Sequence, residues 1–106
     1  MSAHDGINAA NAEAARVAGW PELTGTPAQI PWAISVRADK MREFDAAVVE
    51  ESMSDVDRVL FREALLRQTQ AGEWIDCRSH PWQALALRWL TADERAALFA
   101  RGADHP

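Results

Sequence analysis

The residues with the most reactive chemistry lie close together late in the chain, at Asp76, Cys77 and His80. Carboxylate, thiolate and imidazole groups all bind zinc, and a thiol beside an imidazole is used in nucleophilic catalysis. A single Cys-x-x-His pair supplies too few ligands for a structural zinc site, and this spacing alone does not align a thiolate with a base. We therefore expect a packed thiol and a histidine at a helix start, with no catalytic residue, metal or other cofactor. A small enzyme using Cys77 and His80 is the least favoured alternative.

A cluster of acidic side chains in the middle of the chain could serve for recognition: Glu43, Asp45, Glu50, Glu51, Asp55 and Asp57. Such a negative surface can steer and pair with a basic groove on another protein, including a groove built for nucleic acid. The commoner reading is a solvated face that keeps the protein soluble. We take these acids as candidate partner-binding residues, with Trp20 and Trp74 as candidate anchors because both lie in connecting segments.

Net charge, cysteine content and hydrophobicity limit which classes of partner and which cellular compartment we expect. The net charge of −5 argues against direct binding of duplex nucleic acid, which favours a basic surface. The single Cys77 cannot form an internal disulfide, and no apolar run is long enough to span a membrane, so a cytoplasmic protein is expected. Asp76 and Arg78 interrupt an apolar segment, and either could be a functional charge or a buried structural one paired with a residue such as Arg37. We take the structural pairing as the default.

These residues must be positioned by helices. A short, loosely docked helix is expected over residues 8–18, followed by a connector. Thr26 and Gln29 form a capping pattern for a long helix reaching about Glu51, although Pro31 leaves a later start open. From Ile30, apolar residues recur at helical spacing, which predicts one buried face.

The second half of the chain carries three further helix signals. Ser54 caps a helix that Gly72 is placed to end, and residues 73–78 are too mixed to assign to a helix or a strand. A helix follows His80-Pro81, with Trp82 and Trp89 in the core. Thr91 begins a capping box for a final helix with Leu98 and Phe99 directed inward.

The fold class predicted is therefore all-α, a compact single-domain bundle of four to five helices. Residues 1–25 form an N-terminal leader and connector, and residues 26–106 form the helical domain. The helices carry more apolar surface than a single core needs, so a homodimer is kept as an alternative.

Two separated segments resemble a small domain found in proteins of phages and other mobile elements. They are the LTGxxxQIxWA pattern at Leu23–Ala33 and the WIDxR pattern at Trp74–Arg78, with Pro31 departing from the helix-forming residue typical of its position. The resemblance covers about residues 23–78 and implies a source and a helical shape, with no enzyme. In size, charge and helical content the chain is also similar to type I-F anti-CRISPR inhibitors, which share no motif that would transfer site residues.

The leading hypothesis is a phage or mobile-element protein that binds a host protein complex stoichiometrically. The candidate target is a type I-F CRISPR surveillance complex in the bacterial cytoplasm, whose access to target DNA the acidic surface would block. The alternative is a nucleic-acid-linked accessory module with a local basic stripe made of Arg37, Lys40, Arg42, Arg58, Arg62 and Arg67.

Overall fold

The computed structural model describes residues 3–103 and contains six helices there. In chain order they are α1 (Ala3–Val17), α2 (Gln29–Glu50), α3 (Asp55–Arg67), α4 (Ala71–Asp76), α5 (Trp82–Trp89) and α6 (Ala92–Ala103). Within this range no β-strand forms, and extended pairing is limited to one isolated parallel bridge between Thr24 and Gln70. The predicted all-α bundle is confirmed, with one helix more than expected.

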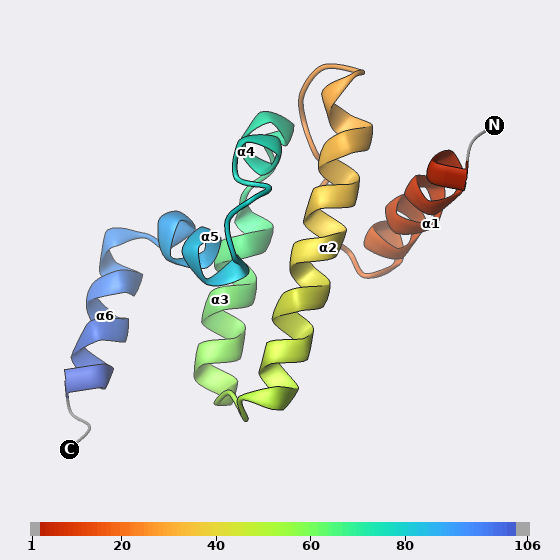
Figure 1. The fold of residues 1–106 in the computed structure, drawn as a ribbon. Helices are drawn as coiled ribbons and strands as arrows, with labels where there is room; N and C mark the ends of the chain where they lie inside the picture. Colours follow the sequence, from red (N-terminus) through yellow and green to blue (C-terminus); the bar gives the residue numbers. More distant parts are fainter. Residues whose placement is uncertain (1–2, 104–106) are drawn as a thin grey trace.

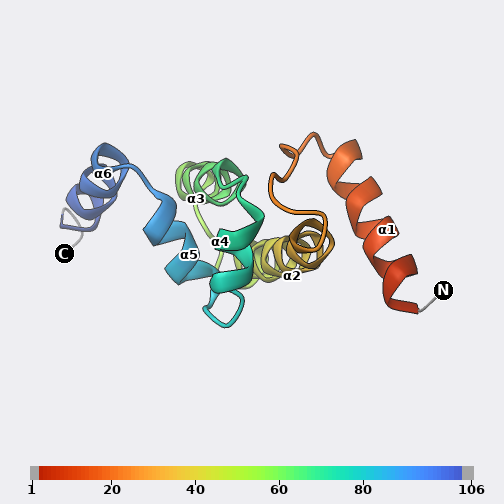
Figure 2. The same ribbon diagram turned by 90° about the horizontal axis from the view of Figure 1, so that it is seen from above.

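Helices α2 to α5 form a packed centre, and α1 and α6 lie on opposite sides of it (Figures 1 and 2). This arrangement makes the molecule elongated, with extents of 55 × 26 × 24 Å. In the part of the chain that the structure describes, no helix has both the length and the apolar character needed to cross a membrane.

The start of α2 follows the capping pattern in the sequence. The backbone N–H of Gln29 donates to Oγ1 of Thr26, and the N–H of Thr26 donates to Oε1 of Gln29, each over 3.1 Å. Residues 27 and 28 form a turn between these partners, so the helix itself begins at Gln29. Pro31 falls within the first turn, where a missing N–H is tolerated because early amides lack helical acceptors.

The core lies between α2, α4, α3 and α5 and is dominated by aromatic rings. Trp74 and Phe44 are fully buried. Edge-to-face contacts join Phe44 to Trp82 at 5.0 Å and Trp74 to Trp89 at 4.7 Å between ring centroids. The indole Nε1 of Trp74 donates to the carbonyl of Gln68 over 2.9 Å, so this large side chain is buried with its polar atom satisfied.

The end of α3 corrects one boundary. Gly72 does not cap α3, which ends at Arg67, but lies inside the short helix α4, which includes most of the segment that the sequence left unassigned. The cause is tertiary: Thr24 donates to the carbonyl of Thr69 over 2.7 Å and accepts from the N–H of Ala71 over 2.8 Å. Because of this pairing, the residues between α3 and α4 do not continue as a helix.

The terminal helix α1 is docked more closely than a loose leader. Asn11 and Ala15 are buried, and Oδ1 of Asn11 accepts from Nη2 of Arg42 on α2 over 2.5 Å. The apolar side chains of Ile7 and Val17 are nevertheless exposed.

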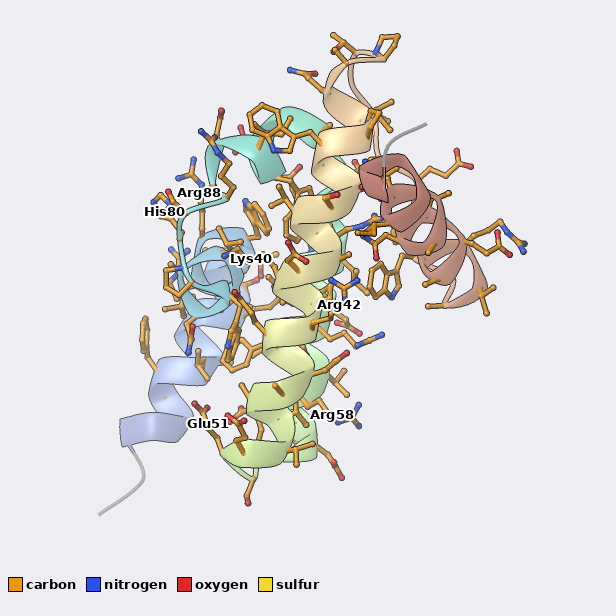
Figure 3. The ribbon with its side chains drawn as sticks, turned by 45° about the vertical axis from the view of Figure 1, so that its right-hand side comes forward. Lys40, Arg42, Glu51, Arg58, His80 and Arg88 are labelled. Carbon is orange, nitrogen blue, oxygen red and sulfur yellow. The ribbon has the colours of Figure 1, made fainter. Side chains whose placement is uncertain are left out.

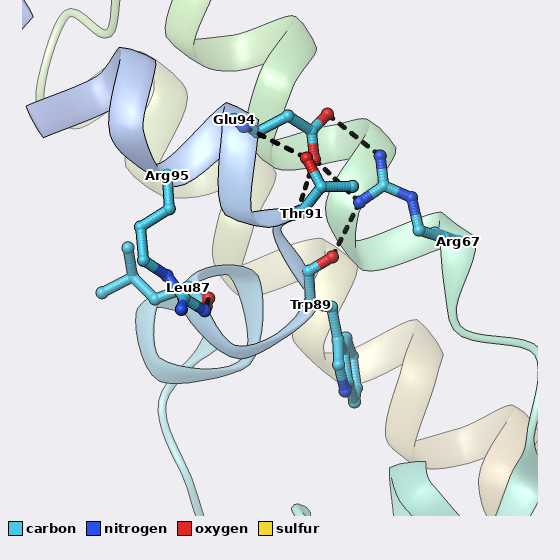
Figure 4. Close-up of polar contacts among 6 residues, drawn as sticks. All are labelled: Arg67, Leu87, Trp89, Thr91, Glu94 and Arg95. Carbon is cyan, nitrogen blue, oxygen red and sulfur yellow. Dashed lines mark hydrogen bonds and ion pairs between the residues drawn. The ribbon is translucent and has the colours of Figure 1, made fainter. Parts of the chain in front are cut away.

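Helix α6 is attached mainly through polar contacts at its first turn (Figure 4). Thr91 and Glu94 form the predicted capping box, with N–H to oxygen distances of 2.8 and 3.1 Å. The carboxylate of Glu94 also accepts two hydrogen bonds from Arg67 of α3, at 2.9 and 3.0 Å. The predicted inward position of Phe99 is wrong, because this side chain is 61% exposed.

Candidate protein-binding groove

An acidic groove lies between the second half of α2, the turn into α3 and the segment that begins α5. It consists of two adjoining hollows of about 560 and 430 Å³ that share Glu51, Trp82 and Gln83. The groove forms because the chain returns after α4 and lays residues 79–83 beside α2. We call it the acidic groove.

Four of the six acids predicted as contact residues line this groove. Glu43, Glu50 and Glu51 line the larger hollow, and Asp57 lines the smaller one with Glu51. Spacings of seven and eight residues along α2 return side chains to the same helix face, so Glu43, Glu50 and Glu51 are brought together by helix geometry.

The other two acids lie elsewhere and are paired. Oδ1 of Asp45 lies 3.4 Å from Nη1 of Arg62, and Oδ1 of Asp55 lies 3.8 Å from Nη2 of Arg58. Asp45 is two residues from Glu43, which places it on a different face of α2. The groove therefore includes a subset of the predicted acidic surface.

The floor of the groove is largely apolar. Ala47, Met53, Phe61 and Trp82 line it beneath the carboxylates, and Trp82 is only 6% exposed because it also packs in the core. Carboxylates above an aromatic floor suit a long cationic side chain, whose methylenes cover apolar surface while its charge meets acids.

Among the described residues, Lys40 is the one lysine or arginine that lines the groove. Lys40 is buried, and its Nζ lies 3.5 Å from Oε2 of Glu43. In Figure 3, Lys40, Glu51 and His80 lie on the same side of α2, whereas Arg42 and Arg58 point to the other side. One ammonium leaves the groove with surplus negative charge.

Sequence reasoning missed three parts of the groove: His80 in the connector before α5, Gln83 in the first turn of α5, and the groove floor. The sequence feature that bears on this part of the groove is the His80-Pro81 pattern, which predicts a helix start and therefore a turn of the chain. It does not reveal which helix the turn lies against.

Neither predicted aromatic anchor lies in the groove. Trp74 is completely buried, so its predicted role as an exposed anchor is wrong; its ring fills the core rather than a connector surface. Trp20 is half-buried on the far side of α2, where the guanidinium carbon of Arg37 lies 5.3 Å from its ring centroid.

The predicted basic stripe is not a continuous surface. Arg37 and Lys40 are buried. The remaining members each lie in an ion pair with a carboxylate: Arg42 with Asp39, Arg58 with Asp55, Arg62 with Asp45 and Arg67 with Glu94.

The reactive residues near Cys77 are not assembled into a site. Cys77 is 3% exposed, and burial raises the pKa of its thiol, which disfavours the nucleophilic thiolate. Asp76 and His80 are exposed. Among residues 3–103, no three histidine, cysteine or acidic side chains come together as a metal site.

The expected pairing of Asp76 or Arg78 with Arg37 is also wrong. Arg78 is exposed, stacks on Trp32 with 5.0 Å from its guanidinium carbon to the ring centroid, and donates to the carbonyl of Ile75. Arg37 instead donates to the carbonyl of Pro21 over 2.7 Å.

Comparisons of the chain with models of protein families, with curated proteins and with solved structures find no match. The resemblance to a phage or mobile-element domain therefore stays a prediction from the two sequence segments.

Proposed function

We propose that this chain is a non-enzymatic protein that acts by binding a basic surface of another protein in its acidic groove. The observation that carries the proposal is the position of Glu43, Glu50, Glu51 and Asp57 along the two adjoining hollows of the groove, above its aromatic floor. Lysine or arginine side chains of the partner would enter the groove, with their charges among the carboxylates and their methylenes against Trp82 and Phe61.

Exposure of the acids supports this proposal. The side chain of Glu43 is 51% exposed, and Glu50 and Glu51 are also exposed. Exposed carboxylates lose little hydration in the free protein, and they accelerate encounter with a positively charged partner at low ionic strength.

The specific target proposed is a type I-F CRISPR surveillance complex, and the chain would be a phage or mobile-element inhibitor acting in the bacterial cytoplasm. A surface that binds DNA must be basic, so an acidic groove seated on it would compete with target DNA. The resemblance of the two sequence segments supports a phage or mobile-element source, and the acidic groove supports the binding of a basic surface.

The test mixes the chain with a purified type I-F complex and measures co-elution by size-exclusion chromatography and binding of target DNA. The groove variant combines Glu43→Gln, Glu50→Gln and Glu51→Gln. The control variant combines Asp39→Asn, Asp45→Asn and Asp55→Asn, which removes the same charge from acids that are paired outside the groove.

We expect the wild-type chain and the control variant to co-elute and to block DNA, and the groove variant to bind at least about tenfold more weakly, since contacts to charged groups are each worth about 1.5–3 kcal/mol. Equal weakening by both variants would mean that net charge, rather than the groove, determines binding. Absence of any association would remove the proposed target.

A further inference from the structure

A second hollow, independent of the acidic groove, lies between α1, α2 and the connector that joins them. Its volume is about 490 Å³, within the range of about 300–1,000 Å³ usual for small-molecule sites. Its apolar lining includes Ala12, Ala15, Leu23, Ile30 and Ile34. We call it the α1–α2 cavity.

The cavity holds a buried positive charge that no acid neutralises. Arg37 is 4% exposed, and burial lowers the pKa of its guanidinium without an opposing carboxylate. Among the described residues, Glu22 is the one acid that lines the cavity; it is exposed and forms no ion pair with Arg37. Arg16, which also lines the cavity, is paired with Glu13. A buried arginine normally has an acidic partner, since an uncompensated charge costs several kcal/mol.

The donors of Arg37 are only partly used. Nη1 donates to the carbonyl of Pro21, whereas Nε is sealed from solvent and has no partner. In a guanidinium group, Nε and Nη2 donate from the same edge, and this edge matches the two oxygens of a carboxylate. The hydrogen bond to Pro21 fixes the guanidinium and leaves that edge for another group.

A second unsatisfied donor belongs to another residue that lines the cavity. Nε1 of Trp20 is buried without a hydrogen-bond partner. Two such donors in one hollow are unusual, because most buried N–H groups are paired with protein or water. Both donors require an acceptor, and the charge of Arg37 favours an anionic one.

We propose that the α1–α2 cavity binds a small monocarboxylate with an apolar body. The carboxylate accepts from Nη2 of Arg37 and, after a local shift of the side chains that cover it, from Nε. The indole of Trp20 lies beside the carboxylate, and the apolar body lies against Ile30 and Ile34. Specificity for an anion comes from the arginine edge, and affinity comes from the apolar lining.

The experiment uses octanoate as the probe and octanamide as its uncharged match. Binding is followed by ¹H–¹⁵N NMR of the indole Nε1–H of Trp20 and the Nε–H of Arg37. We expect octanoate to shift both signals in a saturable way. Octanamide should bind at least about tenfold more weakly, because it cannot form the charge-assisted hydrogen bonds with Arg37.

Three variants locate the site. Arg37→Met is expected to weaken octanoate binding at least tenfold, and Ala12→Leu to weaken it by filling the cavity while leaving both donors in place. Arg78→Met is the matched control, since Arg78 also stacks on a tryptophan but is exposed, and it should bind octanoate as the wild type does.

The proposal would be overturned if octanoate and octanamide shifted the two signals equally, or if Arg37→Met bound octanoate normally. It would also fail if the NMR signal of the Trp20 Nε1–H showed magnetisation transfer with a water molecule in the interior and did not respond to octanoate. Water would then be the hydrogen-bond acceptor. If Arg37→Met fails to fold by circular dichroism, Ala12→Leu decides: unchanged binding of octanoate contradicts the site.

Discussion

The central helices α2 to α5 and the terminal helix α6 both carry apolar residues at helical spacing, yet they are held by different forces. In the centre, Trp74 and Phe44 are fully buried and the rings pack edge to face. At α6, Phe99 is 61% exposed, and the attachment includes hydrogen bonds from Arg67 to Glu94 and from Arg95 to the carbonyl of Leu87. An amphipathic pattern thus specifies a helix and its apolar face, but not whether a neighbour covers that face.

This difference matters for the two candidate sites. The acidic groove lies entirely on the packed centre, between α2, the turn into α3 and the start of α5. The α1–α2 cavity lies at the border between the centre and a terminal helix. The groove should keep its shape when the terminal helices are perturbed, because its floor is continuous with the core.

The largest effect is expected from the core. Trp74→Ala should lower the free energy of unfolding by about 3–5 kcal/mol, because it leaves a large cavity and an unpaired carbonyl at Gln68. Trp32→Ala is the matched control, since Trp32 is 48% exposed, and it should cost less than about 1.5 kcal/mol. Urea denaturation followed by circular dichroism measures both. Equal losses would show that the buried rings do not dominate stability.

A smaller, local effect is expected at α6. Arg67→Met removes three hydrogen bonds, to the carbonyl of Trp89 and to both carboxylate oxygens of Glu94. Because the pair is partly exposed, we expect a global loss of at most about 1 kcal/mol. Amide hydrogen exchange should accelerate in α6 while α2 and α4 stay protected. Faster exchange throughout the molecule would contradict the separation of the two regions.

The smallest effect is a pH dependence at the same contact. The hydrogen bonds from Arg67, followed by those from Thr91, lower the pKa of Glu94 from 4.5 to about 2. The folded pKa is below the unfolded one, so this contribution is complete above about pH 4.5 and is lost as the pH falls toward 2. Chemical shifts of the Glu94 carboxyl and of α6 amides between pH 6 and pH 2 check this. In Arg67→Met the Glu94 midpoint should move upward, and an unchanged midpoint would exclude Arg67 as the main cause.

The sequence predicted local structure well where the signal itself was local. The reciprocal hydrogen bonds of Thr26 with Gln29 and of Thr91 with Glu94 could be anticipated, because a capping box depends only on residues three apart. Helix α4 and the end of α3 could not, because they depend on pairing of Thr24 with Thr69 and Ala71.

The candidate sites divide in the same way. Convergence of Glu43 with Glu50 and Glu51 follows from helical repeat alone. The return of residues 79–83 against α2, which makes a groove of that face, is a tertiary event: the His80-Pro81 pattern marks the turn but not the helix that it lies against. The burial of Arg37 beside Trp20 is a long-range outcome of the same kind, because the connector lies against α2.

The most direct test of the groove as a binding surface places a photocrosslinking amino acid at Gln83, which lines both hollows, and at Val49, which is exposed on another face of α2. After irradiation in a bacterial host, adducts are identified by mass spectrometry. We expect the amino acid at Gln83 to crosslink to a basic surface of a partner protein, and this adduct to be lost when Glu43, Glu50 and Glu51 are changed to Gln. No adduct is expected at Val49. Equal adducts at both positions, or an adduct at Gln83 that survives the three changes, would contradict it.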